Sequence, residues 1–181
     1  MSVTKKPDLK LGYAEYVLYP DDGNRHEIVD GDHYMNPAPS IYHQTISKRL
    51  QHHLYAKIEL AGLGLVFDAP VDVQLSDHDI VQPDLVVLLN DTKARVTPTK
   101  INGAPELLIE IMSPSTADND QRLKRRVYER AGVREYWIVD PCEPAVMQLV
   151  LRDGAYVEAP HGDELRPAIL PAVVVPLPEI W

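Results

Sequence analysis

A strand, a helix and a second strand follow one another in residues 107–140, LLIEIMSPSTADNDQRLKRRVYERAGVREYWIVD. The two apolar ends of this stretch have the length and the Leu, Ile and Val content of strands that are buried on both faces. Between them, Leu123 and Val127 have the spacing of an apolar helix face, and Gly132 ends that helix. A unit of this length is a parallel crossover. The sequence therefore predicts an α/β or α+β fold with a mixed central sheet flanked by helices.

The rest of the chain adds hairpins and one long helix. Asp30-Gly31 and Arg152-Asp153-Gly154 are turn signals, and they predict hairpins over residues 25–35 and 146–158. Ser40 is a suitable cap for a helix that runs to about residue 61. We expect one half-buried strand over 65–75 and a surface loop over 90–103. Residues 1–10 are expected to be a loose tail, and residues 11–181 to form a single domain.

Composition limits the class of protein. The chain has 181 residues with 45% hydrophobic content, which is enough for one well-formed core. It contains a single cysteine, Cys142, so an internal disulfide and a cysteine-based zinc cluster are excluded. No signal peptide opens the sequence, and no apolar run reaches the roughly 18 residues of a membrane span. We expect a cytoplasmic protein that does not enter a membrane.

The charge balance argues against a general nucleic-acid binder. Lys and Arg number 18 against 27 Asp and Glu, which gives a formal charge of −9. A protein with this charge repels polyanions at long range. Residues 121–130, however, hold five basic side chains, a local stripe that can receive a phosphate backbone. The alternative interpretation of this stripe is a solvated helix face.

Two carboxylates, Asp84 and Glu110, lie in the most apolar stretches of the chain. Removing water from an ionised carboxylate costs several kcal/mol unless a cation or several donors replace it. Two such groups in one sheet also repel each other. A divalent cation between them is the simplest solution, and Mg²⁺ or Mn²⁺ prefers oxygen ligands.

A protein cation for Glu110 is missing from its own strand. Side chains alternate along a strand, so Leu108 and Met112 share the face of Glu110, and neither carries a charge. The following helix can supply one, because Asp120, Lys124 and Tyr128 recur every four residues and form one stripe. We therefore expect Lys124 to reach the carboxylates.

An ordered set of motifs over residues 12–158 resembles the Uma2 family of predicted restriction endonucleases, a former domain of unknown function within the PD-(D/E)XK nuclease superfamily. The resemblance rests on Glu27 ahead of Asp30-Gly31, Pro37 and Pro39, His43-Gln44, Pro83-Asp84, Glu110 followed by Ser113-Pro114-Ser115, Lys124, Tyr128, Gly132-Val133 and the run from Glu135 to Pro141. The superfamily pattern places a lysine two residues after the acidic one, where this chain has Met112. In several branches that lysine is thought to have moved to the neighbouring helix, where Lys124 stands.

The resemblance implies a restriction-endonuclease-like fold and metal-dependent hydrolysis of phosphodiesters. It implies that Asp84, Glu110 and the backbone carbonyl of Ile111 hold Mg²⁺ or Mn²⁺, that Lys124 orients the attacking water or neutralises charge, and that Glu27 is a third carboxylate. His43, Asp120 and Tyr128 are possible accessory residues. DNA is the expected substrate, and a homodimer would suit a double-strand cut.

Other interpretations of the same residues remain open. Glu110 could only accept donors at the end of a sheet, and Tyr128 could only fill the core. The whole protein could be a catalytically silent member of the family that binds nucleic acid or a partner protein. It could also be a dimeric structural component, an interpretation suggested by an exposed apolar tail at residues 160–181. The negative charge and Met112 favour the catalytically silent protein.

Overall fold

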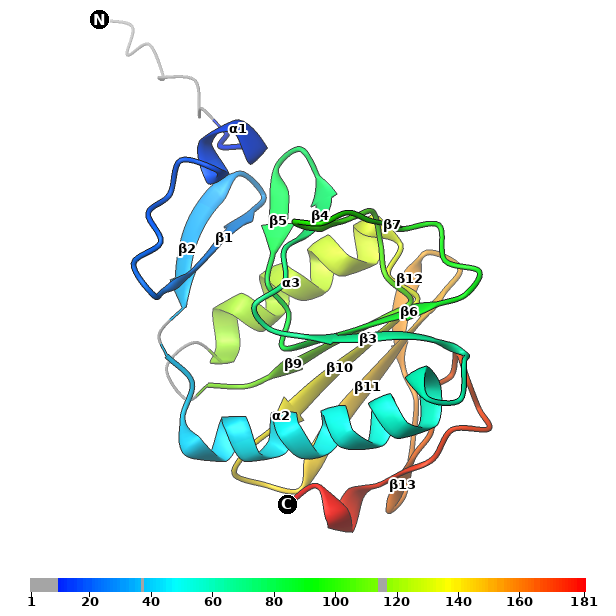
Figure 1. Cartoon of the computed structure of the whole chain (residues 1–181). Helices are drawn as coiled ribbons and strands as arrows, with labels where there is room; N and C mark the ends of the chain where they lie inside the picture. The colour runs from blue at the N-terminus through cyan, green and yellow to red at the C-terminus, as the bar shows by residue number, and fades with distance from the viewer. Residues whose placement is uncertain (1–9, 37, 114–116) are drawn as a thin grey trace, which may run out of the picture.

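Six strands form the central sheet, in the order β12-β11-β10-β9-β6-β3. The computed structural model describes residues 10–36, 38–113 and 117–181 (Figure 1), so nine of the ten residues of the expected loose tail lie outside the described part. The strands are β3 (Gly64–Asp68), β6 (Leu85–Leu89), β9 (Leu107–Ile111), β10 (Glu135–Asp140), β11 (Ala145–Arg152) and β12 (Ala155–Glu158).

Strands β9 and β10 are parallel, and the other neighbouring pairs of the central sheet are antiparallel. Helix α3 (Ala117–Ala131) connects the parallel pair. Gly132, with a φ of 84°, follows the helix in the left-handed conformation that favours glycine. The predicted mixed sheet and its parallel crossover are confirmed.

A second sheet, the hairpin sheet, has the strand order β2-β1-β5-β4-β8-β7. The predicted N-terminal hairpin is confirmed as its first two strands, and Asp30 and Gly31 both have positive φ angles in the turn. The strands are β1 (Arg25–Val29), β2 (Asp32–Asn36), β4 (Val73–Ser76), β5 (Asp79–Val81), β7 (Arg95–Val96) and β8 (Ile101–Asn102). The described residues therefore form a second six-stranded sheet in addition to the predicted central one.

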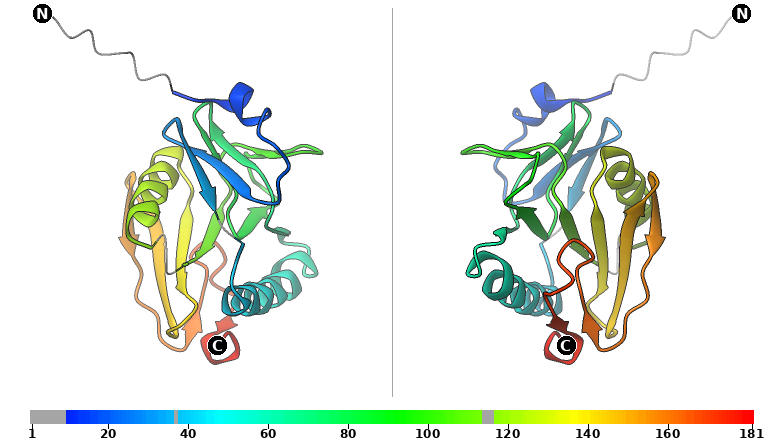
Figure 2. Two further views of the ribbon diagram at one scale, coloured as in Figure 1. Left: turned by 90° about the vertical axis from the view of Figure 1, so that its left-hand side faces the viewer. Right: turned by 90° about the vertical axis from the view of Figure 1, so that its right-hand side faces the viewer.

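Each face of the central sheet is covered by different elements. Helix α2 (Ile41–Leu54) continues as a π-helical turn over Tyr55–Glu59 and packs with the C-terminal residues on one face. Helix α3 and the hairpin sheet pack on the other. Both views of Figure 2 place α2 and the C-terminus at one end of the molecule and the hairpin sheet at the opposite end.

The alternation of β9 explains which of its side chains meets which layer. Leu107, Ile109 and Ile111 belong to the core cluster under α2, whereas Leu108 belongs to the cluster under α3. Glu110 is two residues from Leu108, so it lies on the same face of β9 and projects toward α3, as the sequence predicts. The sheet thus presents one carboxylate to the helix that carries Lys124.

Two expectations for individual strands are wrong. The single strand predicted over 65–75 is divided into β3 and β4, which belong to different sheets. The chain leaves β3 near Pro70, which has no N–H to donate to a ladder. The loop expected over 90–103 contains the short strands β7 and β8.

The apolar tail is part of the core. Val173, Val175, Leu177 and Ile180 are buried in the cluster under α2. The indole N–H of Trp181 donates to the backbone carbonyl of Asp140 at 3.0 Å. This packing removes the basis for a structural component that dimerises through an exposed tail. The remaining elements are small: α1 (Tyr13–Tyr16), β13 (Glu164–Leu165), β14 (Val175–Pro176) and the turn Leu177–Glu179.

Candidate functional site

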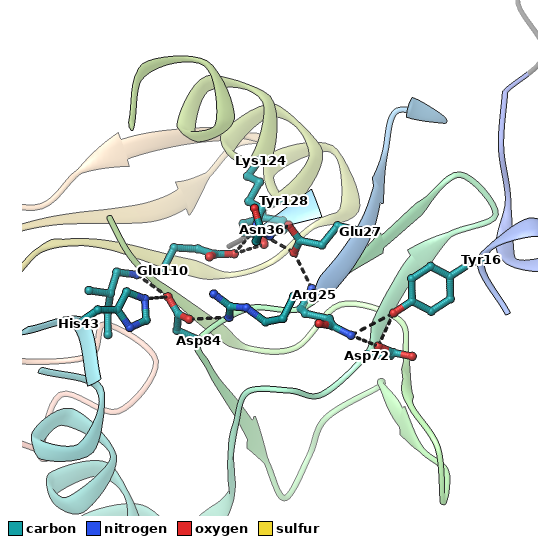
Figure 3. Close-up of polar contacts among 12 residues, drawn as sticks. Tyr16, Arg25, Glu27, Asn36, His43, Asp72, Asp84, Glu110, Lys124 and Tyr128 are labelled. Carbon is teal, nitrogen blue, oxygen red and sulfur yellow. Dashed lines mark hydrogen bonds and ion pairs between the residues drawn. The ribbon is translucent and has the colours of Figure 1, made fainter. Parts of the chain in front are cut away.

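Charged side chains from both sheets and both long helices converge beside β9. Figure 3 shows Arg25 and Glu27 from β1, His43 from α2, Glu110 from β9 and the pair Lys124 and Tyr128 from α3. Asp84 stands immediately before β6 and completes the group.

Lys124 bridges two carboxylates. Its Nζ lies 2.9 Å from Oε1 of Glu27 and 2.9 Å from Oε1 of Glu110. Burial disfavours the ammonium ion, but the charges of Glu110 and Glu27 outweigh that penalty, so the pKa of Lys124 is raised. The lysine is therefore a fixed positive charge. Its position follows from α3, because Val127 packs into the core and directs this face of the helix toward β9.

Glu110 is surrounded by more negative than positive charge. Its Oε1 accepts from Lys124 and from the hydroxyl of Tyr128, the latter at 2.6 Å. Burial is the main cause that raises the pKa of Glu110 to about 7; Lys124 opposes the rise, and the charges of Glu27 and Asp84 add to it. Lys124 alone does not offset burial and the charges of the two neighbouring carboxylates.

Asp84 is held by three donors. Its Oδ1 lies 2.8 Å from Nη1 of Arg25, and its Oδ2 lies 3.0 Å from Nε2 of His43 and 2.9 Å from the backbone N of Ile111. Burial favours the neutral acid, but His43, Arg25 and the N–H of Ile111 lower the pKa of Asp84. Because an ionised carboxylate only accepts, Nε2 of His43 carries the proton in this contact.

Glu27 is the most enclosed of the three carboxylates, with 1% of its surface exposed. Its oxygens accept from the backbone N of Gln82 and from Nδ2 of Asn36, both at 2.6 Å, in addition to Lys124. These donors outweigh the penalty of burial and lower the pKa of Glu27. Near neutral pH it is therefore an anion that holds Lys124 in place.

The family follows from comparison with known proteins. A family model described as "Uma2: Putative restriction endonuclease" matches residues 13–178. The chain belongs to the Uma2 family. The resemblance inferred from the motifs is thereby confirmed, and the family description indicates a nuclease.

A solved structure has the same fold as this Uma2 protein. It is described as a "putative nuclease belonging to DUF820" from Anabaena variabilis, is 18% identical, and covers 94% of this chain and 97% of its own with a TM-score of 0.77. At this identity the likeness shows the fold alone, and it confirms the expected nuclease-like fold. No curated protein matches the chain. None of the helices in the described part of the Uma2 chain has the length and apolar character that a bilayer crossing needs.

The structure brings most of the predicted site residues of this Uma2 protein into two connected groups. Glu27, Glu110, Lys124 and Tyr128 form one, and Asp84, His43 and the backbone of Ile111 form the other. The side chain of Asp120 lies outside the described part of the chain. The catalytic and metal-binding roles of these residues stay predictions.

Sequence reasoning missed Arg25. It stands two residues before Glu27 on β1, so the alternation of the strand places both side chains on one face. That spacing was a usable signal. The spacing does not predict that Arg25 pairs with Asp84, because this contact depends on how the hairpin sheet packs against the central sheet.

The donor set suits a divalent cation in its chemistry. Glu27, Asp84 and Glu110 supply three negative charges, which face two permanent cations, Arg25 and Lys124. The second oxygen of Glu110 accepts no hydrogen bond from the residues that the structure describes, and Asp84 uses three of its roughly four acceptor positions. Among those residues no group of three or more His, Cys, Asp or Glu side chains is already arranged as a metal cage. Glu110 and Asp84 are therefore the side chains that fit the ion, with other ligands coming from backbone or solvent.

Proposed function

We propose that this protein is a Mg²⁺- or Mn²⁺-dependent endonuclease that hydrolyses phosphodiester bonds in DNA. The observation that carries the proposal is the contact of Lys124 with both Glu27 and Glu110, next to Asp84. The contact supports the proposal because a lysine lies against two acidic side chains, as the superfamily pattern requires, although Met112 occupies the strand position two residues after Glu110.

Each residue of the site has a distinct part in this proposal. Asp84, Glu110 and the carbonyl of Ile111 hold the cation, which when bound lowers the pKa of a water and stabilises charge on the phosphate. Lys124 orients the attacking water and neutralises developing negative charge. Glu27 holds the ammonium in place, and Tyr128 holds the carboxylate of Glu110 through its hydroxyl. His43 positions Asp84, and Asp120 is a further accessory residue.

The same proposal extends to the organisation of the active protein. Residues 11–181 act as one nuclease domain in the cytoplasm. A homodimer would bring two such sites to the two strands of a duplex. DNA is preferred over RNA as the substrate because of the restriction-endonuclease description of the family.

A second candidate function is a nuclease-fold protein without catalysis, which binds nucleic acid or a partner protein. Two observations favour it: Met112 stands at the lysine position of the superfamily, and the chain has a formal charge of −9. In this case the carboxylates and Lys124 would only stabilise the fold.

A plasmid-nicking assay separates the two functions. Supercoiled plasmid is incubated with the protein and Mg²⁺, Mn²⁺ or EDTA, and the wild type is compared with Asp84→Ala, Glu110→Ala and Glu158→Ala. The exposed Glu158 on the edge strand β12 is the matched control, because it removes a carboxylate outside the site. The proposal requires nicking that depends on metal, survives Glu158→Ala and disappears in the other two variants. Equal nicking by all four proteins would mean contamination, and binding of the plasmid without nicking would favour the second function.

A further inference from the structure

A cavity of about 270 Å³ opens beside Asp84. Its wall includes Arg25, His43, Gln44, Ser47, Asp68 and Asp84. The charged and polar side chains of this wall come from β1, from the first turns of α2, from the end of β3 and from the residue before β6. Glu110 and Lys124 are not part of this wall, so the cavity is a space next to the carboxylate site rather than the carboxylate site itself.

Arg25 has donors that no described residue of the protein accepts. Its Nη1 contacts Asp84 at 2.8 Å, and this is the only one of its five N–H groups with an acceptor among the described residues. Its Nε is buried without a partner, and 22% of the side chain is exposed. A buried donor without an acceptor costs free energy, so such a donor indicates a missing acceptor. The ion pair with Asp84 fixes the guanidinium, and its N–H groups without an acceptor among the described residues can donate to a ligand.

The surroundings of the cavity favour an anion. Helix α2 has 14 residues, and the hydroxyl oxygen of its capping residue Ser40 accepts from the N–H of His43. His43, Gln44 and the preceding Pro39 line the cavity, so the positive end of the helix dipole is close to it.

We propose that this cavity is a phosphate-binding subsite of the nuclease centre, with Arg25 as its charged donor. The inference rests on the proposed function and deepens it: the ligand is a phosphate of the nucleic-acid backbone next to the bond that is cut. A guanidinium matches phosphate geometry with two parallel N–H groups, which a lysine cannot do. Asp84 thus holds in place the guanidinium that donates to the phosphate. Arg25 is a substrate-binding residue in this arrangement.

One residue of the wall has the opposite sign. Asp68 is exposed at the end of β3 and lines the same cavity. A phosphate in the cavity would be repelled by this carboxylate. Asp68→Asn is therefore expected to strengthen binding, whereas Arg25→Gln is expected to weaken it. Two neighbouring substitutions with opposite outcomes separate a phosphate site from a general loss of structure.

The test measures binding without cleavage. A fluorescein-labelled 20-base-pair duplex is titrated with the Glu110→Gln protein in EDTA, and anisotropy gives Kd at several salt concentrations. In this parent, Arg25→Gln should reduce the slope of log K against log salt by about 0.9, which corresponds to about eightfold weaker binding at 0.1 M salt. Arg25→Lys should keep the slope, because it keeps the charge. Asp68→Asn should tighten binding about twofold.

Two further variants guard against misfolding. Arg25→Gln removes the arginine that pairs with the buried Asp84, although His43 and the N–H of Ile111 still donate to it. Arg25→Gln combined with Asp84→Asn therefore removes both members of the ion pair, and Asp84→Asn alone keeps Arg25. The double variant should show the same reduction of about 0.9 in the slope of log K against log salt, whereas Asp84→Asn alone should keep the slope of the parent. Circular dichroism checks that both variants fold. An unchanged slope in folded variants without Arg25 overturns the subsite alone. A parent that binds no duplex at all overturns both the subsite and the proposed function.

Discussion

The ammonium group of Lys124 on α3 lies 2.9 Å from Oε1 of Glu110 on β9. The superfamily pattern places its lysine on the strand itself, on the same face as the acidic residue and two positions later, where this chain has Met112. The parallel crossover packs α3 over that face. A lysine from the helix therefore reaches the same carboxylate that a strand lysine would reach.

The first prediction concerns moving the lysine from position 124 on α3 to position 112 after β9. Lys124→Met should reduce metal-dependent nicking by about 10²–10³-fold, the effect of losing one preorganised charge-stabilising donor. Adding Met112→Lys should restore part of that activity, because position 112 shares the face of Glu110 and is half-buried. The measurement is the initial nicking rate of the single and double variants.

The control for this pair is Met112→Lys with Lys124 still present. In this control two ammonium groups lie near one pair of carboxylates, so the nicking rate should not exceed that of the wild type. Met112→Lys should therefore raise the nicking rate only in the protein that lacks Lys124. If the double variant folds and is no better than Lys124→Met alone, the helix lysine does not replace a strand lysine.

A second prediction concerns the pH dependence of stability without metal. The pKa of Glu110 rises from 4.5 to about 7 in the folded protein. Between these values the folded state holds a proton that the unfolded state has lost, so the free energy of unfolding falls as pH rises. Glu110→Gln should therefore change little at pH 4.5 and should stabilise by about 1–2 kcal/mol at pH 8, since the full shift is reduced by partial exposure. Urea unfolding in EDTA at the two pH values measures the difference, and a variant that is less stable at pH 8 than the wild type would contradict it.

Glu27 should behave in the opposite way, although it shares Lys124 with Glu110. Its pKa is lowered in the fold, so its ionised form adds stability above the unfolded pKa and that contribution is lost as pH falls through the folded pKa. Glu27→Gln should cost about 3 kcal/mol at pH 7, because it leaves a buried ammonium with one fewer partner. The cost should shrink toward pH 3. Thermal melts of the two glutamine variants side by side test this contrast, and equal effects would mean that neither carboxylate has a distinct role.

The sequence was sufficient for the features that depend on local periodicity. The parallel crossover, the face of β9 and the stripe that carries Lys124 follow from alternation and helical spacing. The contact between Arg25 and Asp84 could not be predicted, because it joins two sheets whose packing has no local signal. The division of 65–75 into two strands was missed for a related reason: the alternation continues across Pro70, while hydrogen-bond partners change from β6 to β5.

A last prediction tests the pairing that places Asp84. A Cβ at Gly64 would lie 2.1 Å from the backbone carbonyl oxygen of Leu88, on the neighbouring strand β6. Backbone atoms cannot move away as a flexible side chain does, so Gly64→Ala should separate β3 from β6 and cost about 3 kcal/mol or more. Gly154→Ala is the control, because its φ is 83° but a Cβ there meets open space, and a left-handed alanine costs only about 1–2 kcal/mol. Urea unfolding gives both values. Because β6 begins directly after Asp84, the Gly64 variant should also lose metal-dependent nicking, and a stable, active Gly64→Ala protein would show that β3 and β6 are not paired in this register.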